Sequence, residues 1–197
     1  MSEQIFVFLK NQSNCCFLGL QVLNLIGVVS NAPLSLIILA PNLVELKLEC
    51  IKPKLLFKVK EFGCLKCLEL VSLNPFSVIG MLRSSRTVKM LTVDIQRGID
   101  SVASKLSLGT LFDCFPNLRS LKLGSGAWLG MEALFCAGGL EGGCTNFSDV
   151  SLLIHRKVDS SIASKFVSKY RVNWPRVRWR WGTWEEGTED NWVSDAC

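Results

Sequence analysis

One spacing of apolar residues recurs seven times along this chain of 197 residues and constrains its fold more than any other feature. The pattern is apolar-x-x-apolar-x-apolar, and successive copies start 23, 22, 23, 30, 29 and 27 residues apart. The copies are Leu20/Leu23/Leu25, Leu43/Leu46/Leu48, Leu65/Leu68/Leu70, Val88/Leu91/Val93, Leu118/Leu121/Leu123, Phe147/Val150/Leu152 and Trp174/Val177/Trp179. Repetition at a period in the twenties predicts a stacked solenoid, because a single unit of that length cannot bury its apolar side alone.

Composition alone would produce some of these triples. Because 49% of the residues are apolar, a given position begins such a triple by chance about one time in eight. Two properties separate the series from chance, namely its even order and the four copies that consist only of leucine. We therefore treat the seven copies as one repeated unit.

The second half of each copy predicts a short β-strand. Leu46 and Leu48 alternate with Glu45, Lys47 and Glu49, which is the period of two expected where one face of a strand is buried. The first apolar residue of each copy then enters the core from the turn before the strand. Seven such strands side by side would place their polar residues together on one outer face.

The segments that return from one predicted strand to the next differ in length. Early returns are short and extended in character, as in residues 54–60, while later returns have room for two or three helical turns at 99–114, 127–137 and 159–170. Pro175, in the last copy, predicts that the final strand lies at a sheet edge. We therefore expect an irregular α/β solenoid of about seven repeats, with strands on one face and helices or extended returns on the other.

The repeats and the charge pattern divide the chain into three parts. Residues 1–16 precede the first clear repeat, residues 17–184 form the predicted repeat domain, and residues 185–197 form an acidic tail without Lys or Arg. The net charge of the whole chain is +5, so the part before the tail is more basic than this total. A basic segment followed by an acidic tail favours local charge screening over a nucleic-acid site.

Nine cysteines are scattered without the regular spacing of a small secreted disulfide framework. Unpaired cysteine packs well as a small core residue, so we expect reduced thiols and a cytoplasmic or nuclear protein. The N-terminus lacks the positive start of a signal peptide. Residues 15–30 are apolar but interrupted by Gln21 and Asn24, and they fall short of the roughly 20 residues that cross a bilayer. No membrane span is expected.

Taken together, the repeats resemble the leucine-rich repeats of plant F-box proteins. The resemblance extends over residues 17–190, and the segment 179–190 at its end also resembles this group. The sequences that carry it are Ala40-Pro-Asn-Leu-Val-Glu-Leu-Lys-Leu48, Cys64-Leu-Lys-Cys-Leu-Glu-Leu70, Phe115-Pro-Asn-Leu-Arg-Ser-Leu-Lys-Leu-Gly124 and Trp179-Arg-Trp-Gly-Thr-Trp-Glu-Glu-Gly-Thr-Glu-Asp190.

This resemblance implies a non-enzymatic module that binds a protein target on its strand face. In its family context, that module selects substrates for a cullin-type ubiquitin ligase. We recognise no F-box, the helical segment that docks onto a Skp-type adaptor, so adaptor binding is expected only if an F-box is supplied elsewhere. A piece of a longer F-box protein and a truncated product without independent function stay open as alternatives.

Residue patterns that carry catalysis or metal binding are weak in this chain. His155 is the only histidine, and no orienting partner lies near it at a suitable spacing. Cys64-Leu-Lys-Cys67 has the CxxC spacing of a metal or redox site, but no second CxxC accompanies it. The glycines of 124–130 follow GxGxxxG rather than the spacing of a nucleotide loop. We therefore predict no enzyme, no metal site and no cofactor.

The segment Arg176-Val-Arg-Trp-Arg-Trp-Gly-Thr-Trp184 interleaves cations with aromatic residues, a pattern suited to single-stranded nucleic acid. The competing interpretation is a terminal repeat whose tryptophans are core and whose arginines face outward, since terminal repeats need an atypical cap. We favour the cap, and a nucleic-acid-binding role stays the alternative function.

The outer side of the predicted strands is the surface that we expect to bind a protein. Its acidic residues are concentrated on the early and middle strands and its arginines on the last, so a partner of complementary charge would be oriented along it. The alternative is an outer side that is merely solvated. The residues predicted to contact the partner are Glu45, Lys47, Glu49, Glu69, Thr92, Asp94, Lys122, Asp149, Arg176, Arg178 and Arg180.

Overall fold

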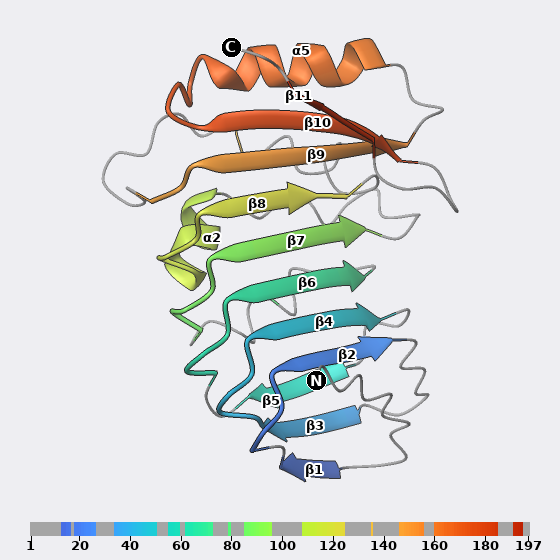
Figure 1. The fold of residues 1–197 in the computed structure, drawn as a ribbon, viewed down its shortest axis with the longest axis vertical. Helices are drawn as coiled ribbons and strands as arrows, with labels where there is room; N and C mark the ends of the chain where they lie inside the picture. Colours follow the sequence, from blue (N-terminus) through green and yellow to red (C-terminus); the bar gives the residue numbers. More distant parts are fainter. Residues whose placement is uncertain are drawn as a thin grey trace.

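A computed structural model of the chain shows an α/β protein built on a ladder of parallel strands (Figure 1). The structure describes residues 13–16, 18–26, 34–50, 55–59, 62–72, 79, 85–95, 108–124, 135, 146–155, 160–184 and 191–194.

The main sheet has eight strands in the spatial order β11-β10-β9-β8-β7-β6-β4-β2. The seven strands from β2 to β10 run parallel to one another, and β11 pairs antiparallel with β10. Neighbouring parallel strands need a long connection that leaves the sheet, which accounts for the period in the sequence. The strands are β2 (Val22–Ile26), β4 (Glu45–Cys50), β6 (Cys67–Ser72), β7 (Met90–Ile95), β8 (Ser120–Leu123), β9 (Asp149–His155), β10 (Arg178–Trp184) and β11 (Asn191–Ser194).

The repeated apolar residues form the core on one side of this sheet. The register pairs Leu46 with Leu68, and Leu68 with Leu91, so that equivalent side chains stack on each other along the ladder. Every residue of the seven triples is buried, with 7% or less of its surface exposed, and all belong to one cluster. The predicted α/β class is therefore confirmed, as is the alternation of buried and outward side chains along the strands. The arrangement is compatible with a repeat solenoid.

A second, smaller sheet is formed by a strand that precedes β2 and by the returns that follow β2 and β4. It contains β1 (Ser13–Cys16), β3 (Leu34–Leu39) and β5 (Leu55–Val59), paired in parallel in the order β1-β3-β5. Figure 1 shows these strands pointing opposite to those of the main sheet. The extended character predicted for 54–60 is thus confirmed by β5. The short early returns close each turn of the chain with a strand.

Helices replace the extended returns in the second half of the chain. Helix α2 (Leu108–Cys114) lies within the predicted range 99–114, and α5 (Ser160–Arg171) matches the helix predicted for 159–170. The buried residues of α5 are Ala163, Phe166, Val167 and Tyr170, the spacing of one helix face. Of the helix predicted for 127–137, the structure describes only Phe135. The centroid of its ring lies 5.3 Å from that of Trp179.

The last repeat differs from the prediction in its register. The predicted triple places Val177 and Trp179 at the two strand positions, but the structure pairs Trp179 with Val150, and Trp181 with Leu152. The two strand positions of the last repeat are therefore shifted by two residues along the chain. A shift of two keeps every side chain on its predicted side of the sheet, because side chains alternate with a period of two.

The position of Pro175 and the presence of strand β11 also differ from what the sequence predicts. Pro175 stands in the turn before β10 rather than in a strand, and β10 lies between β9 and β11. The expectation that Pro175 marks an edge strand is therefore wrong. Strand β11 belongs to the range 185–197, which the sequence predicted as an acidic tail. Within the described ranges, no helix is long and apolar enough to span a membrane.

Candidate functional site

The outer face of the main sheet carries most of the residues predicted to bind a partner. We use this name for the side of β2 to β10 opposite the buried leucines. In the register, Glu45 aligns with Cys67, then Met90, Ser120, Asp149 and Arg178, one residue from each successive strand. A second row lies two residues further along each strand, and it consists of Asn24, Lys47, Glu69, Thr92, Lys122, Ser151 and Arg180.

Ten of the eleven predicted residues lie on strands of this face, and the other lies in a turn. Arg176 precedes β10 and is exposed, so it flanks the outer face without belonging to a strand. Glu49 and Asp94 lie beyond the second row, at the next outward positions of β4 and β7. The fold therefore brings the predicted residues together on one continuous surface.

Some of the predicted binding charges are already paired across strands. Lys47 Nζ lies 2.7 Å from Glu69 Oε1, with both side chains about a third exposed at 33% and 39%. The register places these residues directly opposite each other, the position in which opposite charges stabilise a sheet. A partner that used either charge would have to compete with this pair.

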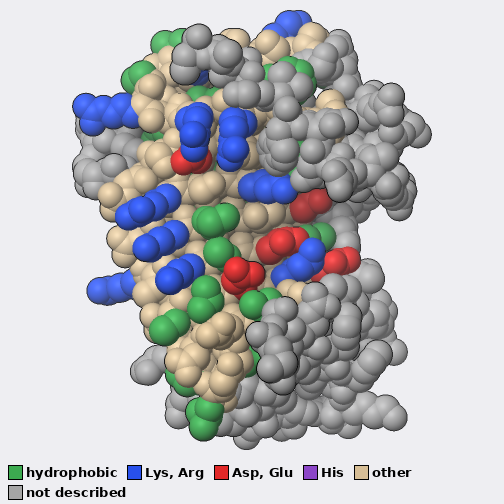
Figure 2. All heavy atoms as spheres, in the orientation of Figure 1, with side chains coloured by type: hydrophobic (Ala, Val, Ile, Leu, Met, Phe, Trp, Pro, Cys, Tyr) green, Lys and Arg blue, Asp and Glu red, His purple; other side chains and the backbone are tan. Residues whose placement is uncertain are grey.

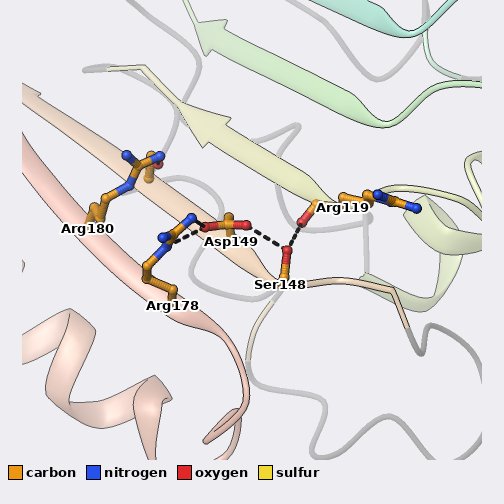
Figure 3. Close-up of polar contacts among 6 residues, drawn as sticks. Arg119, Ser148, Asp149, Arg178 and Arg180 are labelled. Carbon is orange, nitrogen blue, oxygen red and sulfur yellow. Dashed lines mark hydrogen bonds and ion pairs between the residues drawn. The ribbon is translucent and has the colours of Figure 1, made fainter. Parts of the chain in front are cut away.

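A hydrogen-bonded network closes the C-terminal end of the outer face (Figure 3). Arg178 Nε donates to Asp149 Oδ1 over 2.6 Å, and a guanidinium nitrogen of Arg178 forms an ion pair with the same oxygen. Ser148 Oγ donates to Asp149 Oδ2 over 2.6 Å and lies 3.4 Å from the carbonyl oxygen of Arg119. In the next row, Arg180 Nη2 donates to Ser151 Oγ over 3.2 Å. The network links β8, β9 and β10.

These contacts change the acidity of Asp149. Burial alone would raise the pKa of this carboxyl, whose side chain is 16% exposed. The hydrogen bonds from Ser148 and Arg178, with the charges of Arg178 and Arg180, outweigh burial and lower the pKa below 3.8. The ionised form of Asp149 is therefore favoured, and its contacts with Ser148 and Arg178 join the start of β9 to the start of β10.

Sulfur atoms meet near the middle of the outer face. Cys67 Sγ lies 3.9 Å from Met90 Sδ, and Met90 is 52% exposed. Burial, followed by the charge of Glu45, raises the pKa of the Cys67 thiol, so this thiol is less reactive than an exposed one. Cys64, the other member of the CxxC pair, is exposed and unpaired.

Apart from the paired charges Lys47–Glu69 and Arg178–Asp149, the acidic side chains and a series of cations lie at different places on this surface. Figure 2 shows acidic side chains over the middle of the lower strands and a line of Lys and Arg along the edge where strands begin. Lys66, Lys89 and Arg119 stand at the same position of successive repeats, one residue before the strand, and all three are exposed. The alternation of the strand positions does not predict these three residues as a site, because they stand before the strands. The signal was present in the residue that follows each leading Leu or Val.

The Arg/Trp segment divides its residues between the two sides of the sheet. Trp174 and Trp179 are buried at 6% and 4% exposure, and Trp181 packs against the core. Arg178 and Arg180 lie on the outer face. Buried indole rings cannot stack on nucleotide bases, so Trp174 and Trp179 serve packing, as the predicted cap requires, while Trp181 is partly buried against the same core.

Other candidate sites offer little chemistry within the described residues. Asp, Glu, His and Cys do not gather in groups of three there. His155 ends β9, and its side chain lies outside the described part of the chain. Gly124 donates its backbone N–H to the carbonyl oxygen of Val93 over 2.7 Å, which continues the sheet ladder, and the rest of 124–130 lies outside the description.

Comparison with known proteins gives one relative. Protein-family models and solved structures yield no match. The chain is 34% identical, over an alignment of 254 residues, to an F-box/LRR-repeat protein of Arabidopsis thaliana. The alignment includes 91% of this chain, and the chain spans 57% of the relative's length. The expected resemblance is therefore confirmed, and the chain is similar along nearly its whole length to a plant F-box/LRR-repeat protein.

Proposed function

We propose that this chain is a non-enzymatic protein-interaction module that recognises a protein target through the outer face of its main sheet. In this proposal, the seven parallel strands are leucine-rich repeats stacked as a solenoid. The observation that carries the proposal is the register of the outer face, which aligns one outward side chain from each strand into continuous rows. Rows of this length present a surface suited to a protein rather than to a small molecule.

Charge gives this surface a direction. Glu45, Glu49 and Glu69 lie on β4 and β6, while Arg178 and Arg180 lie on β10 at the other end. A target with a basic segment facing β4 and an acidic segment facing β10 would be oriented by this polarity. The pairing of Glu69 with Lys47 leaves Glu45 and Glu49 as the stronger candidates for recognition of a basic segment.

The name of the Arabidopsis relative supports a cellular context for such binding. F-box proteins connect a bound target to a cullin-type ubiquitin ligase through a Skp-type adaptor. We propose that this chain supplies target recognition in that context, in the cytoplasm or nucleus. Direct binding to a Skp-type adaptor should require an F-box supplied from elsewhere. A purified adaptor that binds the chain itself in a sedimentation or calorimetric titration would show that a docking element lies within it.

The target-binding proposal is tested by charge reversal on the outer face. Glu45→Lys and Glu49→Lys, made separately, should each remove a set of proteins that the wild-type chain retains from a cell extract. Asp113→Lys is the matched control, because Asp113 is an exposed acid on α2, a helix packed on the core side. A retained protein counts as a target when, in purified form, its affinity for the wild-type chain is at least about tenfold higher than its affinity for the Glu45→Lys variant. Identical retention by wild type and both variants would contradict the proposal.

A further inference from the structure

A groove runs along the edge of the main sheet at which the strands begin. It has a volume of about 870 Å³ and crosses the turns that precede β2, β4, β6, β7 and β8. We call it the turn-edge groove and define it by Gln21, Val44, Lys66, Lys89 and Arg119, the residues just before these strands, with the turn residues beside them. The line of Lys and Arg at this edge is visible in Figure 2.

The backbone along this groove is already engaged in hydrogen bonds. The carbonyl oxygen of Lys66 accepts the N–H groups of both Lys89 and Met90, at 2.8 and 3.0 Å. The same arrangement of two donors recurs at the carbonyl oxygens of Gln21, Val44, Lys89 and Arg119. A ligand in the groove therefore cannot add to the sheet as a further strand through these carbonyls. Side chains must recognise it.

Side chains also hold successive turns together. Asn42 Nδ2 donates to the carbonyl oxygen of Leu18 over 2.7 Å, and Asn117 Nδ2 donates to that of Arg86 over 2.8 Å. Each amide reaches back to the turn of an earlier repeat. The groove is thus a connected surface that is formed before any ligand arrives, which lowers the entropic cost of binding.

The charges of the groove have one sign. Its described lining contains the cations Lys66, Arg86, Lys89 and Arg119 and no acidic residue. Lys66, Lys89 and Arg119 directly precede adjacent strands, which are spaced about 4.8 Å apart. Like charges at such neighbouring positions repel one another, and an anionic ligand would relieve that repulsion. Glu45 and Asp149, which begin β4 and β9, lie next to this edge without lining the groove, and Glu49, Glu69 and Asp94 lie further along their strands.

We propose that the turn-edge groove binds an extended, Asp/Glu-rich segment of a partner protein. The groove crosses five strand starts, a span of about 19 Å, which about six extended residues would cover. Its cations precede three adjacent strands, β6 to β8, over about 10 Å. Cations placed in a line match a series of carboxylates better than one phosphate, which is bound by several cations converging on a point. The described lining carries no aromatic ring on which bases could stack, which favours a peptide over single-stranded RNA.

This proposal concerns a different surface from the target-binding face. The residues tested here, Lys66 and Lys89, precede the strands, whereas Glu45 and Glu49 lie on β4. Binding at each surface is measured with its own ligand and its own variants. Failure of the two proposals is therefore distinguishable with the same purified protein.

The test uses a fluorescein-labelled peptide of ten residues in which Glu alternates with Ser. Its binding to the full chain is measured by fluorescence anisotropy at low salt, with a Gln-for-Glu peptide as the uncharged comparison. The variant Lys66→Glu/Lys89→Glu should weaken binding at least about tenfold. Lys66→Glu alone is compared with Lys165→Glu on α5, which changes the net charge equally at an exposed position outside the groove. Lys165→Glu should bind like the wild type, and circular dichroism of each variant verifies folding.

Four outcomes would overturn the proposal. The first is no measurable binding of the Glu peptide by the wild-type chain. The second is equal weakening by Lys66→Glu and Lys165→Glu, which would show attraction by net charge alone. The third is a phosphoserine version of the peptide binding at least about tenfold more tightly than the Glu version, which would identify phosphate as the ligand. The fourth is preferential binding of single-stranded RNA that is lost in the Lys66→Glu/Lys89→Glu variant.

Discussion

Arg178 Nε donates a hydrogen bond to Asp149 Oδ1 over 2.6 Å, and the two residues face each other in the register of β10 and β9. Asp149 is also held by Ser148, and its side chain is 16% exposed, whereas that of Arg178 is 69% exposed. The carboxylate is therefore fixed, while much of the guanidinium faces solvent. At this end of the outer face, a partner would meet Arg178 before Asp149.

The lowered pKa of Asp149 predicts a pH-dependent contribution to stability. Because its pKa in the folded chain lies below 3.8, the stabilisation is fully present above that value and is lost as pH falls through the folded pKa. We expect Asp149→Asn to lower the free energy of unfolding by about 0.5–1 kcal/mol at neutral pH, since solvent screens the exposed Arg178. Urea unfolding over a pH series measures the difference from wild type, with Asp113→Asn as the control. A difference that persists unchanged below the folded pKa would contradict this account.

The alternation of β7 predicts opposite outcomes for neighbouring substitutions. Leu91 is 1% exposed in the core, and Met90 beside it is 52% exposed on the outer face. Leu91→Ala should cost about 2–5 kcal/mol of unfolding free energy, because it leaves a cavity in a packed cluster. Met90→Ala should cost no more than about 0.5 kcal/mol. Chemical denaturation of both variants measures this contrast, and similar losses from the two would refute the assignment of faces.

The sequence was sufficient to assign the buried and outer sides of the main strands. Leu46 and Leu48 alternate with charged residues, and only one face of a strand can bury both. The same alternation predicts that Glu45, Lys47 and Glu69 lie on the outer face. It could not reveal that Lys47 pairs with Glu69, because that contact depends on which strands are neighbours and on their register.

Other features could not be predicted because local patterns left them ambiguous. The last repeat offers apolar residues at 174, 177, 179 and 181, and two registers shifted by two positions satisfy the same alternation. The structure selects Trp179 and Trp181 for the strand positions. Strand β11 has only four residues, and its pairing with β10 depends on tertiary contacts rather than on a local sequence pattern. Lys66 and Lys89 became a candidate site only when the register aligned successive turns.

The close approach of β7 and β8 predicts that Gly124 cannot be replaced freely. A Cβ atom added there would lie 2.6 Å from Cβ of Asp94, well inside van der Waals contact. Gly124→Ala should therefore lower the unfolding free energy by about 1–3 kcal/mol. Because the clash includes the Cβ of residue 94, Asp94→Gly should partly relieve it. A double-mutant cycle measured by urea unfolding should show that the double variant is more stable than the sum of the single effects predicts. Strict additivity would place the cause of any loss elsewhere.

The packing of Trp179 predicts that the Arg/Trp segment contributes stability rather than nucleic-acid binding. The ring centroids of Trp179 and Phe135 are 5.3 Å apart, and those of Phe135 and Phe166, on α5, are 5.8 Å apart. Truncation of Trp179 removes the link between β10 and this aromatic cluster, so Trp179→Ala should cost about 3–5 kcal/mol of unfolding free energy. Arg176→Ala, at an exposed position in the preceding turn, is the control and should change stability by no more than about 0.5 kcal/mol.

A filter-binding titration with single-stranded RNA separates the two roles of this segment. The milder variant Trp179→Phe keeps an aromatic ring in the core, so the comparison can be made on folded protein. If the tryptophans only pack, Trp179→Phe and Arg176→Ala should leave any RNA retention within about twofold of the wild type at matched salt. Specific retention that falls in both variants would instead mean that the segment opens to bind RNA, which would require the buried indole rings to leave the core.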